Sequence, residues 1–223
     1  LFLAAIVSAF WYLRLEEIDR EQEAVKRDVE YAQQRVRLRL LERQEQLMRL
    51  ARDASGREID FDEFVSRAES LVSQYPELQA LTWIDDRRRI SASYAAPSIN
   101  PSQSRLAGTV LRVGDTESTY SLARDLQQPV YSQPASTQPT NAGDLADLLQ
   151  LHIPLANHGR FTGMVLGEYS IDGLLRYGVP SEVSAKYAVS FLDGKGNLLA
   201  GSTVSVHNHP AAQLGFANTP NEY

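Results

Sequence analysis

The chain has 223 residues, which is enough for one or two domains. It carries 22 Lys and Arg against 28 Asp and Glu, and no basic patch interleaved with aromatic residues, which argues against nucleic acid as a partner. Cysteine is absent, so the fold depends on neither disulfides nor thiolate metal sites. Hydrophobic residues make up 43% of the chain, which is sufficient for a core.

The first thirteen residues, Leu1–Leu13, form an uncharged apolar run that ends close after Trp11 and Tyr12. Aromatic pairs of this kind mark the interface of a membrane span. Thirteen helical residues cover only about 20 Å of the roughly 30 Å hydrocarbon core. We therefore expect residues 1–13 to be the C-terminal part of a transmembrane helix, in a sequence that is a fragment.

Two alternatives to a membrane span remain for this apolar run. A cleaved signal peptide would begin with a basic region and end at a small-residue cleavage site, and neither is present. An ordinary buried helix suits the length of the run but not its unbroken apolarity.

Residues 14–54 contain neither Pro nor Gly and predict a long stalk helix. From Leu15 to Val36, apolar and small residues recur at alternating spacings of three and four, which is a heptad-like stripe. After a stutter at Leu40 the stripe resumes and continues to Ala54. The stripe predicts a homodimer through the stalk helix; alternatively, its second half lies on its own domain. About 40 helical residues reach roughly 60 Å, which would hold a domain clear of a bilayer.

Capping residues predict where the stalk ends and the next helix begins. Gly56 suits the left-handed capping position after the stalk. Asp60 is the predicted N-cap of a second helix, and Glu63 would complete a capping box. Pro76 ends this helix.

Downstream of Pro76, short apolar or alternating segments predict the strands of an antiparallel sheet. The predicted strands are residues 78–84, 89–95, 129–132, 148–155 (broken at Pro154) and 161–171. Further helices are predicted at residues 116–126, capped by Asp115, and 171–177. Loops are predicted at residues 97–104 and in the Gln-, Pro-, Ser- and Thr-rich segment 133–141.

A second unit is predicted from residue 181 onward. Residues 187–192 and 198–202 read as two strands joined by the Gly-rich turn 193–197. Two strands cannot make a stable domain alone. We therefore expect residues 181–223 to be the beginning of a second lobe whose remainder is cut off.

The order of these elements resembles a PAS-like domain, and the segments resemble the extracytoplasmic Cache (PDC) sensor domains of bacterial transmembrane receptors. The segments that carry the resemblance are Tyr75–Asp85, Ile153–Leu155 with Gly159–Leu166, Ile171–Leu175, and Tyr187–Gly196. The resemblance covers residues 59–202 and describes architecture. It implies an α+β fold in which the long helix is followed by a PAS-like sensor lobe, residues 55–180, with flanking helices. CHASE-type sensors share this layout and are the close alternative.

The resemblance also implies a function. It indicates a ligand-sensing region of a signal transduction receptor in the bacterial inner membrane, with residues 14–223 on the periplasmic side. The output would be a histidine kinase, with a chemoreceptor or a cyclic-dinucleotide enzyme as alternatives, and it would follow a second membrane span. The partner would be a small-molecule ligand of unknown class, an organic acid being one candidate.

A pocket on the sheet of the sensor lobe is the place to look for ligand-binding residues. A carboxylate ligand would need Arg, Tyr or Trp donors there. The candidates on or near the sheet are Trp83, Tyr94, Arg124, Tyr131 and His152. Each has a structural alternative: the tryptophan as core, the tyrosines as buried rings with wet hydroxyls, and Arg124 as a surface residue on a helix.

The chain carries no recognised catalytic motif. Gly194-Lys195-Gly196 fits a hairpin turn far better than a phosphate site. His207 and His209 alternate as two metal ligands on a strand would, but no third ligand is evident and an exposed loop is the simpler interpretation. We therefore predict no metal site and no cofactor.

Three functional hypotheses follow. The first is a ligand-sensing ectodomain without enzymatic activity of its own. The second is a periplasmic protein-docking module on a membrane stalk, with no small-molecule pocket. The third, an extracytoplasmic enzyme, has no residue constellation to support it.

Overall fold

The computed structural model describes residues 2–97, 107–111, 117–134 and 148–201, with side chains from residue 20 onward. The helices are α1 (Phe2–Ser55), α2 (Phe61–Gln74), α3 (Glu117–Leu126), α4 (Ile171–Gly178) and α5 (Ser181–Ser184). The strands are β1 (Leu78–Asp85), β2 (Ile90–Ala95), β3 (Val130–Tyr131), β4 (Leu148–Asn157), β5 (Arg160–Ser170), β6 (Ser190–Leu192) and β7 (Leu198–Gly201). The predicted loop 97–104, apart from its first residue, the Asp115 cap, most of segment 133–141 and the His207 and His209 pair lie outside the described residues.

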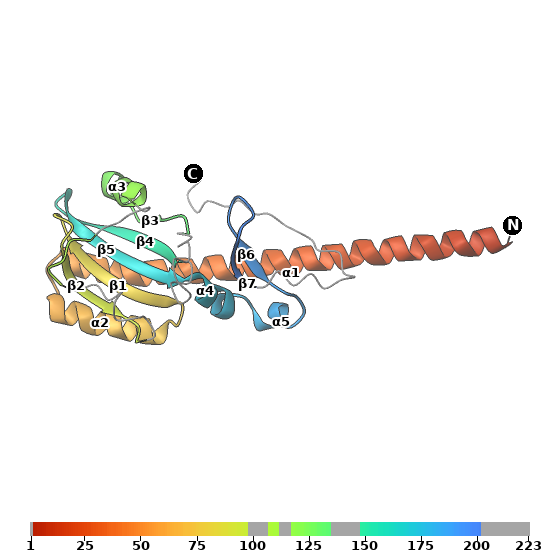
Figure 1. Ribbon diagram of the computed structural model, residues 1–223, viewed down its shortest axis with the longest axis horizontal. Coiled ribbons are helices and arrows are strands. Elements are labelled where there is room, and N and C mark those ends of the chain that lie inside the picture. The colour runs from red at the N-terminus through yellow and green to blue at the C-terminus, as the bar shows by residue number, and fades with distance from the viewer. Residues whose placement is uncertain (1, 98–106, 112–116, 135–147, 202–223) are drawn as a thin grey trace.

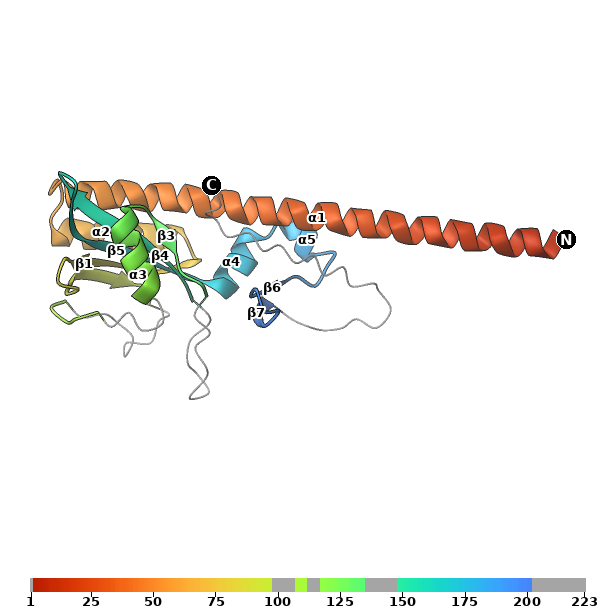
Figure 2. The ribbon, with the colours of Figure 1, turned by 90° about the horizontal axis from the view of Figure 1, so that it is seen from above.

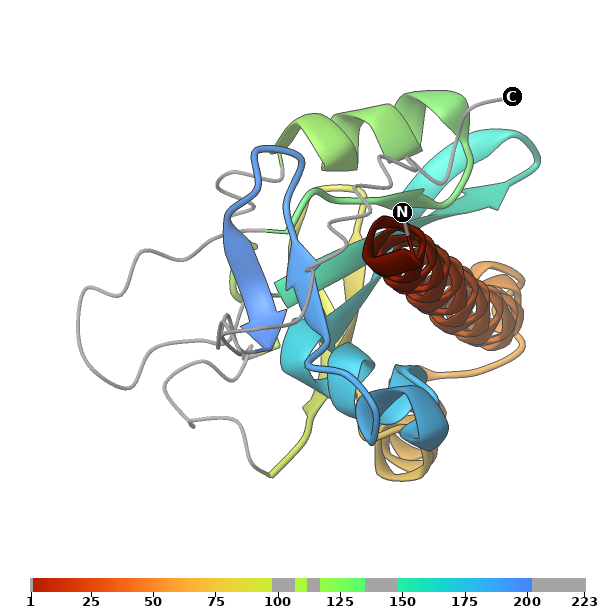
Figure 3. The ribbon, with the colours of Figure 1, turned by 90° about the vertical axis from the view of Figure 1, so that its right-hand side faces the viewer.

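The centre of the lobe is a five-stranded antiparallel sheet in the order β2-β1-β5-β4-β3. We call its two sides the α1 face, which α1 and α2 cover, and the α3 face, over which α3 packs (Figure 1). Seen along α1 in Figure 3, this helix lies beside the sheet and away from α3. The predicted α+β, PAS-like arrangement with a long N-terminal helix is confirmed.

Period-two alternation along the strands produces two separate cores. Leu81 and Val165 point to the α1 face, where Leu47 of α1 and Phe64 of α2 join them. At Gly167 the helix approaches so closely that a Cβ would lie 2.9 Å from Leu47 Cδ1. A larger residue at this position would therefore require the end of the Leu47 side chain to move.

The residues of the α3 face form the second core. Ile84 and Met164 lie on this face and contact Tyr120 and Ala123 of α3, all of them 3% exposed or less. Fully burying such side chains contributes about 1.5–3 kcal/mol each.

The helix α1 is continuous from Phe2 to Ser55, about 80 Å long, and extends well beyond the lobe toward the N-terminus (Figures 1 and 2). Leu47, Ala51 and Ala54 of the predicted stripe are buried against the lobe. The structure thus shows that the second half of the stripe lies on its own domain.

The end of α1 differs from the prediction by one residue. The Glu58 N–H bonds the Asp53 carbonyl and the Arg57 N–H bonds the Ala54 carbonyl, which is the Schellman pattern. Arg57, with φ 58°, occupies the left-handed position, whereas Gly56 was predicted there and does not have a positive φ. The prediction was wrong because it assigned the position by residue type and not by the hydrogen bonds that close the helix.

The N-terminus of α2 follows the prediction in part. The Asp60 carboxylate accepts a hydrogen bond from the Glu63 N–H at 2.8 Å, so the predicted N-cap is confirmed. The Glu63 carboxylate, which was expected to return to Asp60, pairs instead with Arg67, which also reaches Asp53 on α1. Arg67 therefore ties α2 to the end of α1.

Strand β4 was predicted to break at Pro154 but continues to Asn157. On one side Pro154 lies opposite Met164 of β5. On the other side β3 is only two residues long and ends opposite Leu151 and His152. Pro154 therefore sits on an edge, where the missing N–H breaks no ladder hydrogen bond.

The second unit lies alongside α1 on the N-terminal side of the lobe (Figure 2). Val179 and Val183 bury Ala32 of α1, and Lys186 pairs with Asp28 at 3.3 Å. Strands β6 and β7 form the predicted hairpin, shorter than expected by three residues at the start of β6. Whether residues 181–223 begin a second PAS-like lobe stays a prediction.

Within the described part of the chain, no helix is long and apolar enough to cross a membrane. The side chains of residues 1–13 fall outside the description, so the transmembrane assignment of that segment stays a prediction.

Candidate ligand-binding face

The α3 face carries an unusual set of buried polar side chains at the centre of the sheet. Thr82 and His152 are fully buried, Ser132 is 5% exposed and Glu168 is 6% exposed. Buried polar groups cost free energy unless they find partners. A strand position that needs only packing would carry an apolar residue, so these positions point to a chemical role.

The register of the strands aligns these side chains in two neighbouring rows. Leu166 lies opposite both Thr82 and His152, and Thr82 bonds Ser93 on β2 at 2.9 Å. In the next row Gln150 lies opposite Glu168, and its Nε2 donates to Glu168 Oε1 at 2.9 Å. The rows run across the four strands β2, β1, β5 and β4.

Ser132, just after β3, continues the second row. Its hydroxyl accepts a hydrogen bond from the Gln150 backbone N–H at 3.1 Å, and its own N–H donates to the Gln150 carbonyl at 2.8 Å. Gln150 is thereby fixed on both its backbone and its side chain.

Two polar atoms on this face are buried and have no hydrogen-bond partner within the described residues: the Tyr120 hydroxyl and the Gln150 amide oxygen. The Tyr120 ring from α3 lies 6.2 Å from the His152 ring, centroid to centroid, in an edge arrangement. Burial raises the pKa of Tyr120, a shift that the positive charge of Arg88 opposes, so the hydroxyl is neutral and can donate. Such atoms are normally satisfied by water or by a bound molecule.

An arginine from the β1–β2 turn holds α3 in place. The Arg88 guanidinium forms two hydrogen bonds with the Glu117 carboxylate, one of them 2.7 Å long, and lies 4.7 Å from the Tyr120 ring centroid. The hydrogen bonds between the two side chains lower the pKa of Glu117 and raise the pKa of Arg88. The position of Tyr120 above the sheet therefore depends on this ion pair.

The structure divides the five predicted ligand-binding residues between different surfaces. His152 lies on the α3 face, next to Tyr120. Trp83, Tyr94 and Tyr131 lie on the α1 face, packed against its core. Arg124 is on the exposed side of α3, where it pairs with Asp125 at 2.8 Å. The five residues therefore do not converge on one pocket.

Tyr120, Gln150 and Glu168 were missed by the sequence analysis. Gln150 and His152 alternate with leucine and isoleucine in an apolar strand, and Glu168 stands alone in a run of buried residues. A polar residue at an inward strand position was the available signal. To conclude from this signal that Gln150 and Glu168 lie side by side, one must know the register between β4 and β5, which the sequence does not specify.

The opposite face holds a second polar cluster, which joins α1 to the sheet. Glu77 is fully buried, and its Oε1 lies 3.3 Å from the Nε atoms of both Arg39 and Arg43. Arg43 also lies over the Tyr75 ring, 3.6 Å from its centroid. We call this set of four residues the Glu77 clasp.

The clasp also contacts the exit helix α4. The Glu77 carbonyl accepts a hydrogen bond from the Ser170 N–H, which precedes α4. A Cβ at Gly173 of α4 would lie 2.9 Å from Glu77 Cα, so only glycine permits this approach. The stalk helix, the first strand and the exit helix therefore meet at one buried residue.

Among the described residues, no group of three or more His, Asp or Glu side chains could hold a metal ion. The Gly-rich turn is held by Asp193, whose carboxylate accepts hydrogen bonds from the Lys195 and Asn197 N–H groups, both at 2.8 Å. The turn therefore uses its polar groups internally, as a hairpin does.

Solved structures share this fold. The ligand-binding domain of the Campylobacter jejuni chemoreceptor Tlp3 matches with TM-scores of 0.55 in complex with L-norvaline and 0.54 in complex with L-valine, at 10% identity. These matches cover 82% and 89% of this chain and 70% and 76% of the other. The ligand-binding domain of the Pseudomonas aeruginosa amino acid chemoreceptor PctC, in complex with GABA, matches with a TM-score of 0.46 and 15% identity over 73% of this chain and 67% of the other.

The chain spans 54% of the length of a structure named Methyl-accepting Chemotaxis protein X. It spans 49% of the extracellular domain of a protein assigned as a histidine kinase, mmHK1S-Z3. No family model matches the sequence, and no curated protein matches it. The chain therefore shares its fold with the ligand-binding domain of a chemoreceptor, and the predicted resemblance to Cache sensors is confirmed at the level of the fold. The CHASE-type alternative stays a prediction.

Proposed function

We propose that this chain is the extracytoplasmic ligand-sensing region of a membrane-bound bacterial receptor, with a histidine kinase as its output. The proposal is supported by the fold shared with the Tlp3 ligand-binding domain, whose structures hold L-valine and L-norvaline. The observation that carries it is the buried polar pair on the α3 face: the Tyr120 hydroxyl and the Gln150 amide oxygen, both without a hydrogen-bond partner in the described chain.

The chemistry of the α3 face favours a small polar ligand that both donates and accepts hydrogen bonds. The Gln150 amide oxygen can only accept, so it needs an N–H or O–H group of the ligand. The neutral Tyr120 hydroxyl can donate to a carboxylate or carbonyl oxygen. Small amino acids and hydroxy acids carry both groups. An organic acid with no donor would satisfy Tyr120 alone.

We propose that the Glu77 clasp transmits occupancy of the α3 face to α1. Thr82 on β1 and Glu168 on β5 lie on strands that lead directly to the clasp, through Glu77 just before β1 and Ser170 at the end of β5. A ligand shifts a two-state equilibrium only by its difference in affinity for the two states. The ligand would therefore favour one arrangement of the strands relative to α1.

We also propose that the chain forms a homodimer through α1. The contact would use a row of exposed residues and not the predicted stripe, whose second half is buried against the lobe. Tyr31, Leu38 and Leu41 are 42%, 53% and 49% exposed, at spacings of seven and three. These spacings form a heptad seam that faces away from the lobe's own core. The second copy would cover this row, and residues 1–13 would anchor both copies in the membrane.

Thermal melting of the 223-residue chain against a library of small acids, amines, amino acids and sugars tests the sensing function. We expect one compound class to raise the melting temperature, because a ligand that binds only the folded state stabilises it. Tyr120→Phe removes the buried hydroxyl alone and should abolish most of the shift. The control, Tyr177→Phe, removes a hydroxyl from a tyrosine that is 43% exposed and should leave the shift intact.

If no compound class raises the melting temperature, the result contradicts the proposal and favours the protein-docking module. An equal shift in the Tyr120→Phe chain and in the native chain would place the ligand elsewhere than on the α3 face.

A further inference from the structure

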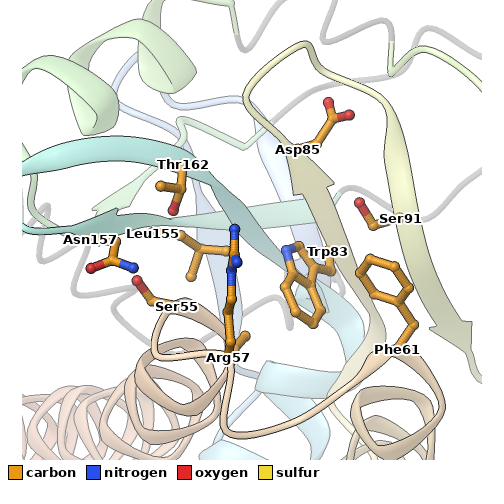
Figure 4. A pocket seen from close by; sticks show the side chains of 10 residues that line it. Ser55, Arg57, Phe61, Trp83, Asp85, Ser91, Leu155, Asn157 and Thr162 are labelled. Carbon is orange, nitrogen blue, oxygen red and sulfur yellow. The ribbon is translucent and has the colours of Figure 1, made fainter.

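The tip of the lobe, at the end remote from the N-terminus, contains a hollow of about 200 Å³ on the α1 face (Figure 4). We call it the tip pocket. It lies where α1 ends and α2 begins, against the ends of the strands β1, β2, β4 and β5. Its lining residues are Arg57, Phe61, Trp83, Asp85, Leu155 and Asn157, with Ala54, Ser55, Ser91 and Thr162 completing the wall. The sheet separates this pocket from the α3 face.

One wall of the tip pocket is aromatic. Trp83 lies between Phe61 and Phe64, with ring centroids 4.9 Å and 5.4 Å away in edge and tilted arrangements. Phe64 is fully buried behind it, whereas Phe61 is 51% exposed at the rim. Trp83 is therefore held rigidly by its neighbours and offers a flat apolar surface to the pocket.

The opposite wall carries an exposed cation, Arg57, whose side chain has no partner within the part of the chain that the structure describes. The Arg57 side chain extends between Leu155 and Trp83 (Figure 4). Its side chain forms neither an ion pair nor a hydrogen bond with any described residue, whereas Arg67 and Arg88 both pair with carboxylates. Its backbone occupies the left-handed region at φ 58°, a conformation that costs an arginine free energy. The Arg57 guanidinium is exposed and is therefore open to an anionic group of a ligand.

Asp85 limits what can bind beside Arg57. Its Oδ1 accepts hydrogen bonds from the Arg87 and Arg89 N–H groups at 2.9 and 2.7 Å, so this carboxylate is fixed by the β1–β2 turn. A second negative charge on a ligand would be repelled from this side of the pocket. The volume is below the roughly 300–1,000 Å³ of pockets for drug-sized molecules, so the ligand must be small.

We propose that the tip pocket binds a small monocarboxylate with a flat apolar body, the carboxylate on Arg57 and the body against Trp83. A guanidinium binds a carboxylate through two parallel hydrogen bonds, which fixes the ligand's orientation. This site is independent of the α3 face, so either proposal can fail without the other.

Fluorescence of Trp83 tests the proposal. The chain has two tryptophans, so Trp11→Phe leaves Trp83 as the only reporter. The probes are benzoate, benzamide and benzamidine, which share one shape and differ in charge, added to the full chain in mild detergent. We expect a saturable change with benzoate, with a dissociation constant in the millimolar range for so small a ligand. Benzamide and benzamidine should bind at least tenfold more weakly.

Arg57→Gly is the decisive variant, because glycine is the residue best suited to the left-handed position and the fold is preserved. It should weaken benzoate binding about tenfold or more. Gln127→Gly makes the same backbone change at another left-handed residue, φ 51°, at the end of α3, and should leave binding unchanged. Unchanged binding in Arg57→Gly, stronger binding of benzamidine than of benzoate, or no saturable change in the native pocket would each overturn the proposal.

Discussion

Arg57 and Glu77 each hold an environment that their residue type rarely adopts. One holds a left-handed backbone at the surface, and the other holds a carboxylate at 0% exposure. The sequence analysis singled out neither residue. The left-handed backbone of Arg57 and the burial of Glu77 depend on the hydrogen bonds and packing around them, which a single charged residue in a sequence does not indicate.

Arg57→Gly should raise the free energy of unfolding by roughly 1 kcal/mol, since glycine adopts the left-handed C′ position without steric cost. Arg57→Ala removes the same side chain but keeps a Cβ, so it should give no gain. Urea denaturation measures both variants. Equal stabilisation by alanine and glycine would mean that the side chain, and not the backbone, is responsible.

Glu77→Gln should lower the free energy of unfolding by roughly 1–3 kcal/mol, because it leaves Arg39 and Arg43 without their buried counter-charge. The Arg39 and Arg43 side chains are 33% and 14% exposed, so hydration offsets part of the loss. Glu45→Gln is the matched control. It breaks an exposed ion pair with Arg49 on the same helix and should cost less than about 0.5 kcal/mol.

Among the elements, α1 combines three roles along its length. Its C-terminal turns supply core residues, its middle carries the arginines of the Glu77 clasp, and its exposed side carries the Tyr31, Leu38 and Leu41 row. The periodicity of the sequence predicted the helix and the core stripe. The second row was not predicted, because a wide helix surface holds two apolar stripes and only the lobe decides which one is buried.

Leu38→Glu with Leu41→Glu should weaken self-association at least tenfold, because it places charges in a seam that a second copy would cover. Sedimentation of the full chain measures the dissociation constant. The control, Leu122→Glu with Leu126→Glu, introduces the same charges on α3 at leucines of similar exposure. A dimer that tolerates the α1 pair but not the α3 pair would contradict the proposed interface.

The β6–β7 turn should respond to acid through Asp193. Hydrogen bonds from Asn197 lower the pKa of this carboxylate below the ordinary aspartate range. A lowered pKa means that the carboxylate stabilises the turn fully above about pH 3.9, the ordinary value, and that this contribution is lost as the pH falls through the lower folded-state pKa. Carboxyl titration followed by NMR checks the shift, and Asn197→Ala should raise the pKa.

For the molecule as a whole, the sequence predicted the α+β architecture, whereas the five predicted ligand-binding residues stay a prediction and lie on different surfaces. The strands, the second helix and the exit helix follow from alternation, capping and proline positions, which are local signals. Which side chains come together on the α3 face depends on which strands are paired and in which register. Trp83 and Thr82 are adjacent in the chain, yet one faces the tip pocket and the other the α3 face. Only the register and the packing of α1 and α3 separate them.

Ligand sensing on the α3 face is tested most directly by amide hydrogen exchange of the full chain with and without the compound that raises its melting temperature. We expect slower exchange in β4 around Gln150 and in β5 around Glu168, together with a change in α1 around Arg43. Protection confined to the tip pocket or to the outer surface, with β4, β5 and α1 unchanged, would contradict a receptor that senses its ligand on the α3 face.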